Sequence, residues 1–415
     1  MKTIWIIDHY SSEPKYFGIQ RQFDFATELS KRGYRVVVIS SSFSHFSHSF
    51  ISEEKVYCSK LNDNAFYIYL HTRPYTTNGG FGRIRNMLSF KKAVLRNYKN
   101  IAKIYGKPDV VTGCSVHPLT WIASYKVAKH FKAKFLVEVR DLWPEVWVLT
   151  GEKSRLNPMV LYFGHLEKWA YTKADKIIYS MLYGDKYICD KLGFSREKTA
   201  LIGQPMDCRR FIENSKTQEI PDDIKNFISN SFVCVFTGYY MKYEGVYTML
   251  DAAKTIKEKG YSIKFLFLGS GKEEQGMKQF VRENNLNNVM VYGRINKQVV
   301  PAILCLCDIC LAHCSAEGKP ESYKYGISKN KVNEYLYSGH CVIYGRDDKE
   351  DPVAKCGAGY VIEPFQPNQF VDKILMVYNM TDNQREKFGK SGREYIEANH
   401  KVESLVDKLI DIYEN

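Results

Sequence analysis

The chain has 415 residues, of which 45% are hydrophobic and 25% charged, and its formal net charge is +13. Domains usually hold roughly 100–200 residues, so this length predicts two large domains. No apolar run reaches the roughly 20 residues that span a bilayer, and the N-terminus turns polar too soon for a signal peptide. We therefore expect a cytoplasmic protein.

The excess of basic residues favours an anionic partner, such as a nucleotide, a phospholipid or a pyrophosphate lipid. No zinc-finger, RNP-like or helix-turn-helix pattern is present, so nucleic acid is not expected as a partner. Among the eleven cysteines, Cys305 and Cys307 end a helical pattern and Cys310 lies in a predicted strand. Zinc ligands converge from loops, so these cysteines are interpreted as core residues, and we expect no metal and no cofactor.

In the N-terminal half, apolar strands alternate with amphipathic helices. The first strand is "TIWIID", the helix "RQFDFATELSKRG" follows, and "YRVVVIS" is the next strand. The pattern returns in "PDVVTG", "LTWIASYKVAKHF", "KFLVEV" and "DKIIYS". Near-continuous apolar strands joined by helices are typical of a parallel sheet covered on both faces.

Residues 205–231 are polar and charged and are interpreted as a linker. The alternation restarts at "FVCVFTG" and continues through "CVIYG". The predicted fold class is therefore α/β, with two Rossmann-like doubly wound domains and an interdomain cleft. We expect an N-terminal domain over 1–205, a C-terminal domain over 206–390, and a helical segment over 391–415 that crosses back to the first domain.

A short helix predicted over 330–337 begins in a loop of small and polar residues. The free N–H groups and the dipole of a helix N-terminus favour an anion, so this loop is a candidate diphosphate site. The residues that would face the anion are Gly326, Ile327, Ser328 and Lys331. A carboxylate one turn further in, Glu334, can accept hydrogen bonds from a ribose diol. The alternative is that Glu334 is a solvated helix residue.

Other candidates follow strand ends. In "FTGYYMKYEGV" a strand runs into Gly238, and Lys242 can neutralise a pyrophosphate. In the first half, "SVHPLT" places His117, and "EVRDLWPE" places Arg140 and Asp141, where strands end. The alternatives are a lysine in water, a structural histidine and a structural ion pair.

The segment 81–107 carries eight basic residues and no acidic one, with apolar residues between the charges. A basic amphipathic helix of this kind binds anionic membrane surfaces. The alternative is a helix that packs on the first domain.

Taken in order, these motifs resemble the GT-B glycosyltransferases of family 4, in particular the bacterial branch that builds capsule and O-antigen sugars. The motifs "EVRDLWPE" and "YGISKNKVNEY" are specific, and the resemblance covers nearly the whole chain. It implies a retaining transferase that uses a nucleotide sugar, UDP-linked, and a polyprenyl-diphosphate-linked saccharide acceptor at the inner membrane.

The resemblance also assigns roles. Lys242, His117 and Glu334 would be catalytic, with Glu334 at the second acid of the E-x7-E motif. Donor-binding residues would be Gly238, Arg294, Gly326, Ile327, Ser328, Lys331 and Glu334. Acceptor-binding residues would be Gly18, His117, Arg140 and Asp141. Gly326 stands where the motif has its first acid, so the contacts to the donor sugar would come from the backbone. The alternatives are a UDP-sugar epimerase of the related fold and a non-catalytic partner that binds nucleotide sugars.

Overall fold

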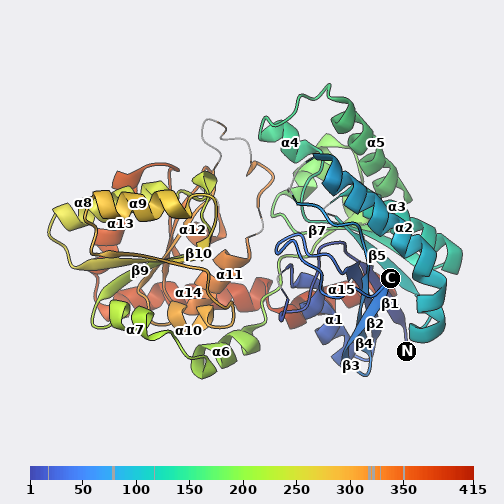
Figure 1. Cartoon of the computed structure of the whole chain (residues 1–415), viewed down its shortest axis with the longest axis horizontal. Helices are drawn as coiled ribbons and strands as arrows, with labels where there is room; N and C mark the ends of the chain where they lie inside the picture. Colours follow the sequence, from blue (N-terminus) through green and yellow to red (C-terminus); the bar gives the residue numbers. More distant parts are fainter. Residues whose placement is uncertain are drawn as a thin grey trace. The chain divides into compact units, whose positions relative to one another are not determined.

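A computed structural model describes residues 1–16, 18–76, 80–115, 117–315, 319, 323–327, 329–348 and 351–415. The chain forms two compact units, each with its own sheet of mostly parallel strands (Figure 1). Unit 1 comprises Met1–Pro205, Tyr325–Ser328 and Val402–Asn415. Unit 2 comprises Met206–Lys324 and Lys329–Lys401.

Unit 1 is built on an eight-stranded sheet in the order β3-β4-β2-β1-β5-β6-β7-β8. The described strands are β1 (Thr3–Ile7), β2 (Arg35–Ser41), β3 (Val56–Asn62), β4 (Ala65–Leu70), β5 (Val110–Cys114), β6 (Lys134–Val139), β7 (Lys176–Tyr179) and β8 (Thr199–Leu201). Strand β3 pairs antiparallel with β4, whereas the other pairs are parallel. The order reverses between β1 and β5, which is where such sheets bind ligands.

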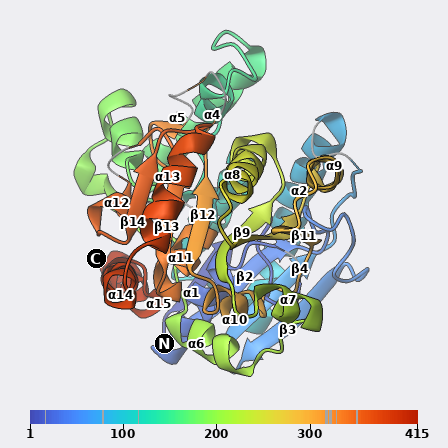
Figure 2. The ribbon, with the colours of Figure 1, turned by 90° about the vertical axis from the view of Figure 1, so that its left-hand side faces the viewer.

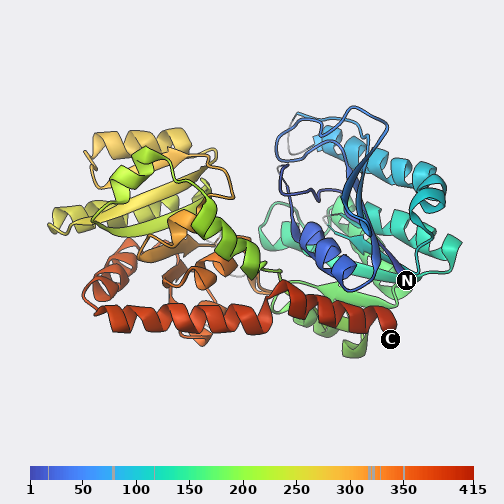
Figure 3. The ribbon, with the colours of Figure 1, turned by 90° about the horizontal axis from the view of Figure 1, so that it is seen from below.

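Helices cover both faces of this sheet. They are α1 (Arg21–Lys31), α2 (Gly80–Tyr105), α3 (Pro118–Phe131), α4 (Glu145–Leu149), α5 (Pro158–Lys173) and α15 (Val402–Glu414). One core joins the sheet to α2, α3 and α5 around Trp5, Trp121 and Tyr171. The other core joins it to α1 and α15 through Phe25 and Leu405. Figure 3 shows the red terminal helix α15 beside the blue helix α1.

Unit 2 is built on a six-stranded, all-parallel sheet in the order β11-β10-β9-β12-β13-β14. Its strands are β9 (Phe232–Tyr239), β10 (Ile263–Ser270), β11 (Val289–Gly293), β12 (Ile309–His313), β13 (Cys341–Gly345) and β14 (Gly359–Ile362). This is the doubly wound order, and its switch point lies between β9 and β12. The prediction of two doubly wound α/β domains is therefore confirmed.

The helices of unit 2 also form two layers, with α8, α9 and α13 on one face and α10, α11 and α14 on the other (Figure 2). The helices are α6 (Cys208–Thr217), α7 (Asp222–Ile228), α8 (Val246–Glu258), α9 (Glu274–Glu283), α10 (Val300–Leu304), α11 (Asn330–Ser338), α12 (Pro352–Lys355), α13 (Pro367–Tyr378) and α14 (Asp382–Asn399). The core of the unit contains Phe236, Met249, Leu311 and Phe370.

The prediction of a linker over 205–231 is wrong, because α6 and α7 occupy most of that range. The carboxylate of Asp207 caps α6 by accepting from the N–H of Arg210 at 2.9 Å, and Phe211 anchors the helix with a buried ring. Short polar helices of this kind carry little apolar periodicity. The C-terminal boundary also differs from the expected residue 391, because α14 belongs to unit 2 as far as Asn399 and unit 1 resumes at Val402.

All eleven cysteines are unpaired, and Cys307, Cys310 and Cys314 are buried. This agrees with their interpretation as small core residues. Within the described parts of the chain, no helix combines the length and the apolar character needed to cross a bilayer.

Candidate active site

Three charged side chains of unit 2 meet at the carboxyl ends of β9 and β12, the switch point of the sheet. Glu244 follows β9, and Lys329 and Lys331 lie at the start of α11. The Nζ of Lys329 is 2.7 Å from Oε1 of Glu244, and the Nζ of Lys331 is 2.5 Å from Oε2. The side chains are only 8% to 12% exposed, so this lysine–glutamate cluster is largely withdrawn from water.

Among the residues that the structure describes, the lysine–glutamate cluster holds two cations and one anion, which leaves one positive charge uncompensated. Burial lowers the pKa of Lys331 to about 8, although the Glu244 carboxylate acts in the opposite direction. Burial alone would raise the pKa of Glu244, but Lys331 and Lys329 hold it below its usual value. An unpaired positive charge in a buried place is costly, so an anion that binds beside it stabilises the protein.

Gly238 makes room for the ammonium of Lys331. A Cβ at Gly238 would lie 3.1 Å from the Nζ of Lys331, and the backbone there has φ +139°, a conformation that other residues rarely adopt. The Nζ of Lys331 also lies 4.1 Å from the centre of the Phe236 ring. The glycine near the end of β9 therefore lets the lysine reach the strand end.

His313, at the end of β12, fixes the loop that carries Glu244. The N–H of Phe365 donates to Nε2 of His313 at 3.1 Å, so the proton of the neutral ring is on Nδ1, which donates to the carbonyl oxygen of Tyr243 at 3.0 Å. Burial lowers the pKa of His313 to about 4, so the ring stays neutral. A Cβ at Gly245 would lie 2.3 Å from this ring, which explains the glycine at that position.

The other predicted donor residues of unit 2 lie at different places around the cluster. Lys242 is exposed and begins a one-turn helix, Lys242–Glu244. Glu334 lies in α11 with an 18% exposed side chain, 3.8 Å from the Nζ of Lys297. Arg294 is exposed and follows β11. The structure thus brings together Gly238 and Lys331, and it pairs Glu334 with the loop after β11.

Gly326 and Ile327, two further predicted donor residues, belong to unit 1. Gly326 has φ +82°, and a Cβ there would lie 3.1 Å from the backbone nitrogen of Leu182. Ile327 is partly buried. Ser328 lies outside the described residues. The glycine at the position of the missing motif acid therefore has a conformational role, because both its φ and the close backbone contact require it.

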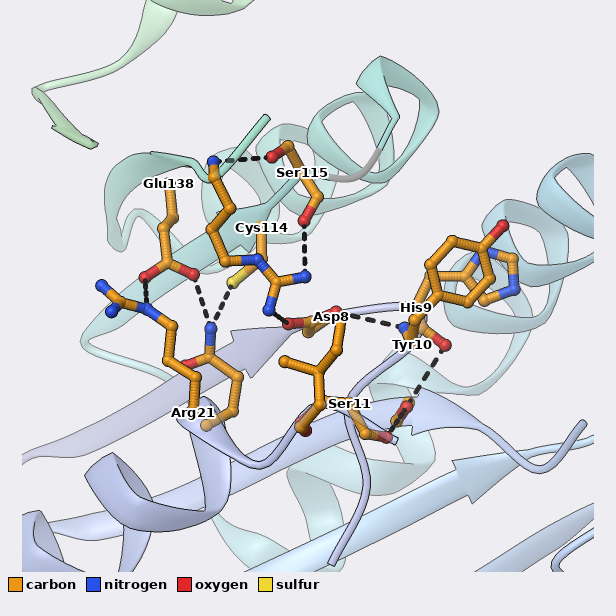
Figure 4. Close-up of polar contacts among 12 residues, drawn as sticks. Asp8, His9, Tyr10, Ser11, Arg21, Cys114, Ser115 and Glu138 are labelled. Carbon is orange, nitrogen blue, oxygen red and sulfur yellow. Dashed lines mark hydrogen bonds and ion pairs between the residues drawn. The ribbon is translucent and has the colours of Figure 1, made fainter. Parts of the chain in front are cut away.

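Unit 1 holds a buried ion-pair network at the carboxyl ends of β1 and β6 (Figure 4). The Nε of Arg21 donates to Oε1 of Glu138 at 2.8 Å, and NH1 of Arg140 lies 3.1 Å from Oδ2 of Asp8. Arg140 also donates to the carbonyl oxygen of Ser115 at 3.1 Å. The predicted residue Arg140 thus pairs with Asp8, across the sheet, rather than with its neighbour in sequence.

Three ligand-type atoms lie close together in this network, from Asp8, Cys114 and Glu138. Burial would raise the pKa of Glu138, but Arg21 and Arg140 hold it below its usual value. The Nε2 of Gln22 donates to both Glu138 and Cys114. These groups already have hydrogen-bond and ion-pair partners, which favours a structural network over a metal site.

His117 and His9 form a buried pair at the switch point of unit 1. Nδ1 of His9 and Nε2 of His117 are 2.7 Å apart, and one ring donates to the other. Burial, with a smaller contribution from Arg83, lowers the pKa of His117 to about 3, and burial also lowers the pKa of His9, so both rings are neutral. Nδ1 of His117 has no partner among the described residues, so it can bond to a group that enters the site.

The remaining predicted acceptor residues lie in two loops of unit 1. Gly18 belongs to the loop after β1, where a Cβ would lie 2.2 Å from Oγ of Ser12. Asp141 follows β6 and is exposed. Both loops follow the carboxyl ends of strands, so both residues lie at the edge of the sheet where ligands are expected.

Sequence reasoning missed several residues of these clusters, among them Glu244, Lys329, His313 and His9. His9 follows the apolar strand β1 in "IIDHY", the same signal that singled out Arg140. Glu244 stands two residues after Lys242, in a stretch that the sequence had already singled out. The pairing of Glu244 with Lys329 joins residues 85 positions apart, so no local pattern reveals it.

Comparisons with known proteins agree with this architecture. Residues 21–210 match the model of Glycosyltransferase Family 4, and residues 218–395 match that of Glycosyl transferases group 1. An uncharacterized glycosyltransferase of Methanocaldococcus jannaschii is 24% identical over 255 residues, which are 61% of this chain and 63% of that protein. The match therefore spans less than two thirds of that relative.

Solved structures show the same fold. Sucrose-phosphate synthase from Thermosynechococcus elongatus has a TM-score of 0.73 at 16% identity, covering 100% of this chain and 98% of that one. HepE from Anabaena, solved with UDP and glucose, has a TM-score of 0.64 at 13% identity, and WaaG, a glycosyltransferase of lipopolysaccharide biosynthesis, has 0.65 at 17%. Both comparisons cover 99% of each chain. The chain is a glycosyltransferase of the GT-B type, with a Glycosyltransferase Family 4 domain followed by a group 1 domain.

Proposed function

We propose that the enzyme transfers an N-acetylated sugar from a UDP-sugar to a lipid-linked saccharide, with retention at the anomeric carbon, during capsule or O-antigen synthesis. HepE was solved with UDP and WaaG acts in lipopolysaccharide biosynthesis, which supports this choice of donor and pathway. The observation that carries the proposal is the buried lysine–glutamate cluster at the switch point of unit 2.

Sugar transfer breaks the bond between C1 and the diphosphate, so negative charge grows on the leaving group. In the proposal, Lys331 and Lys329 face that charge, and the N-terminal amides of α11 add to the positive potential. Counted over the described residues, the cluster carries one uncompensated positive charge before the donor binds, so charge that develops in the transition state is stabilised more than the ground state. We therefore propose transfer without a metal ion, because these lysines supply the positive charge.

His117 is proposed to orient a hydroxyl of the sugar or the acceptor. Its pKa of about 3 keeps the ring neutral at physiological pH, so Nδ1 takes part as a hydrogen-bonding atom rather than as a charged acid. The bond to His9 couples the two rings, so the proton shared between them determines whether Nδ1 donates or accepts. A retaining transfer of this kind places no demand on a protein general base.

Membrane association through residues 81–107 remains part of the proposal, at the cytoplasmic face of the inner membrane. The structure buries Met87, Val94 and Ile101 of α2 in unit 1, so the packing alternative holds for that face of the helix. Phe81 and Ile104 are 82% and 70% exposed, and the basic residues lie among them. Any contact with anionic lipid would therefore use the outer, basic face.

Titration of the purified enzyme with UDP tests the proposal, together with Lys331→Met, which removes the excess positive charge of the cluster. We expect saturable binding to the wild type that weakens at least tenfold in the variant. Two assays address the alternatives. An epimer formed from a UDP-N-acetyl sugar without any acceptor would favour the epimerase, and UDP binding without transfer to a panel of lipid-linked acceptors would favour the non-catalytic partner.

A further inference from the structure

A basic pocket lies on unit 1, between α2 and the segment that follows β4. Its volume is about 410 Å³, within the range of about 300–1,000 Å³ typical of ligand sites. Four cationic side chains line it, together with His71 and apolar groups such as Leu88: Arg73, Arg85, Lys92 and Arg96. Of the residues that the structure describes, no acidic one lines the pocket.

Helical spacing explains how α2 contributes three of these cations. Arg85, Lys92 and Arg96 are separated by seven and four positions, so they fall on one face of the helix. All three residues are exposed. The opposite face of α2 packs into the core through Phe90 and Val94, so the basic residues point away from the core.

The other wall of the pocket is fixed to α2 by hydrogen bonds. Nδ2 of Asn86 donates to the carbonyl oxygen of Arg73 at 2.7 Å and to Oγ1 of Thr72 at 3.0 Å. The N–H of Arg73 donates to Oγ of Ser89 at 3.0 Å. Asn86 and Thr72 are buried, so the two walls of the pocket are held together before any ligand arrives, and only the exposed cationic side chains have to become ordered on binding.

The four cations have no carboxylate within ion-pair distance among the described residues. Elsewhere in unit 1, exposed basic residues such as Lys15, Lys60 and Arg196 each pair with an acid. Four like charges around one cavity repel one another, and a multivalent anion would remove that repulsion. Three of the four are arginines, whose planar forks match phosphate oxygens.

We propose that this pocket binds a diphosphate group, either free in solution or carried by a lipid. The anion lies between the arginines of α2 and Arg73, and Leu88 offers an apolar surface to whatever is attached to it. The pocket belongs to unit 1 and uses none of the residues of the lysine–glutamate cluster, so the inference stands apart from the proposed donor site.

The test uses inorganic pyrophosphate at constant ionic strength, measured by calorimetry in a Lys331→Met background, in which the contribution of the proposed donor site is reduced. The pocket variant is Arg85→Gln with Arg96→Gln. The matched control, Lys99→Gln with Lys103→Gln, removes the same charge from exposed positions of α2 that do not line the pocket. Thermal melts verify that both variants are folded.

We expect the pocket variant to weaken pyrophosphate binding at least tenfold and the control to change it less than twofold. Sedimentation with phosphatidylcholine vesicles that carry a polyprenyl diphosphate, against plain phosphatidylcholine vesicles, identifies the source. A larger loss of vesicle binding in the pocket variant than in the control would support a lipid-borne anion. Equal losses in the two variants with both probes, or no change in either, would overturn the proposal.

Discussion

Replacing Lys331 with methionine shows whether this lysine serves ligand binding or the stability of the fold. The side chain keeps nearly its length and its contact with Phe236, but the uncompensated charge disappears and Glu244 retains Lys329 as its partner. A structural lysine would stabilise the folded enzyme. A lysine that is held ready for an anion imposes a cost on the ligand-free protein, so its removal stabilises that protein.

The size of this stabilisation follows from the pKa of Lys331. Its fall from 10.5 to about 8 corresponds to about 3 kcal/mol, since each pKa unit is worth about 1.4 kcal/mol. This destabilisation is fully present below pH 8 and is relieved as the pH rises toward 10.5, where the unfolded lysine also loses its proton. Lys331→Met should therefore raise the free energy of unfolding by up to about 3 kcal/mol near neutral pH, and by much less near the pKa of an unfolded lysine.

The assay pairs chemical denaturation with UDP titration. Losing a charged hydrogen bond of about 2 kcal/mol should weaken UDP binding roughly 30-fold. Lys254→Met, a change of a half-exposed lysine on α8, serves as the control and should alter neither quantity appreciably. A variant that is destabilised by about 3 kcal/mol and binds UDP normally would refute the reasoning.

Three further predictions concern the same sites. UDP affinity should fall above pH 8, by up to about tenfold per pH unit, because binding requires protonated Lys331. Calorimetry in buffers of different ionisation enthalpy would detect the proton uptake. An affinity that stays constant to about pH 9.5 would contradict this prediction. Glu334→Ala should weaken UDP binding while the melting temperature stays constant, and unchanged affinity would remove Glu334 from the site. His117→Phe should lower kcat for transfer at least tenfold with UDP affinity unchanged, whereas a variant with full kcat would assign the histidine pair a structural role.

The fold could be predicted from the sequence because buried parallel strands read as continuous apolar runs, as in "TIWIID" and "FVCVFTG". The helices α6 and α7 could not be predicted, since the only features that indicate them are the cap at Asp207 and a few buried residues such as Phe211. In polar stretches, capping and tertiary packing determine the structure, and neither can be recognised from the spacing of apolar residues in the sequence.

The candidate site was predicted in part. Gly238 and Lys331 each carried a local signal, a glycine at a strand end and a helix start. Their convergence on Glu244 depends on the strand order, which brings β9 beside β12 although β10 and β11 lie between them in the sequence. The His9–His117 pair, 108 positions apart, depends on the corresponding crossover in unit 1. Long-range pairs of this kind follow from topology and not from spacing.

The central claim is that the lysine–glutamate cluster of unit 2 binds the diphosphate of the donor. A crystal structure of the enzyme with UDP tests it most directly. The account predicts a phosphate oxygen within about 3 Å of the Nζ of Lys331. A diphosphate bound elsewhere, with Lys331 still contacting only Glu244, would contradict it.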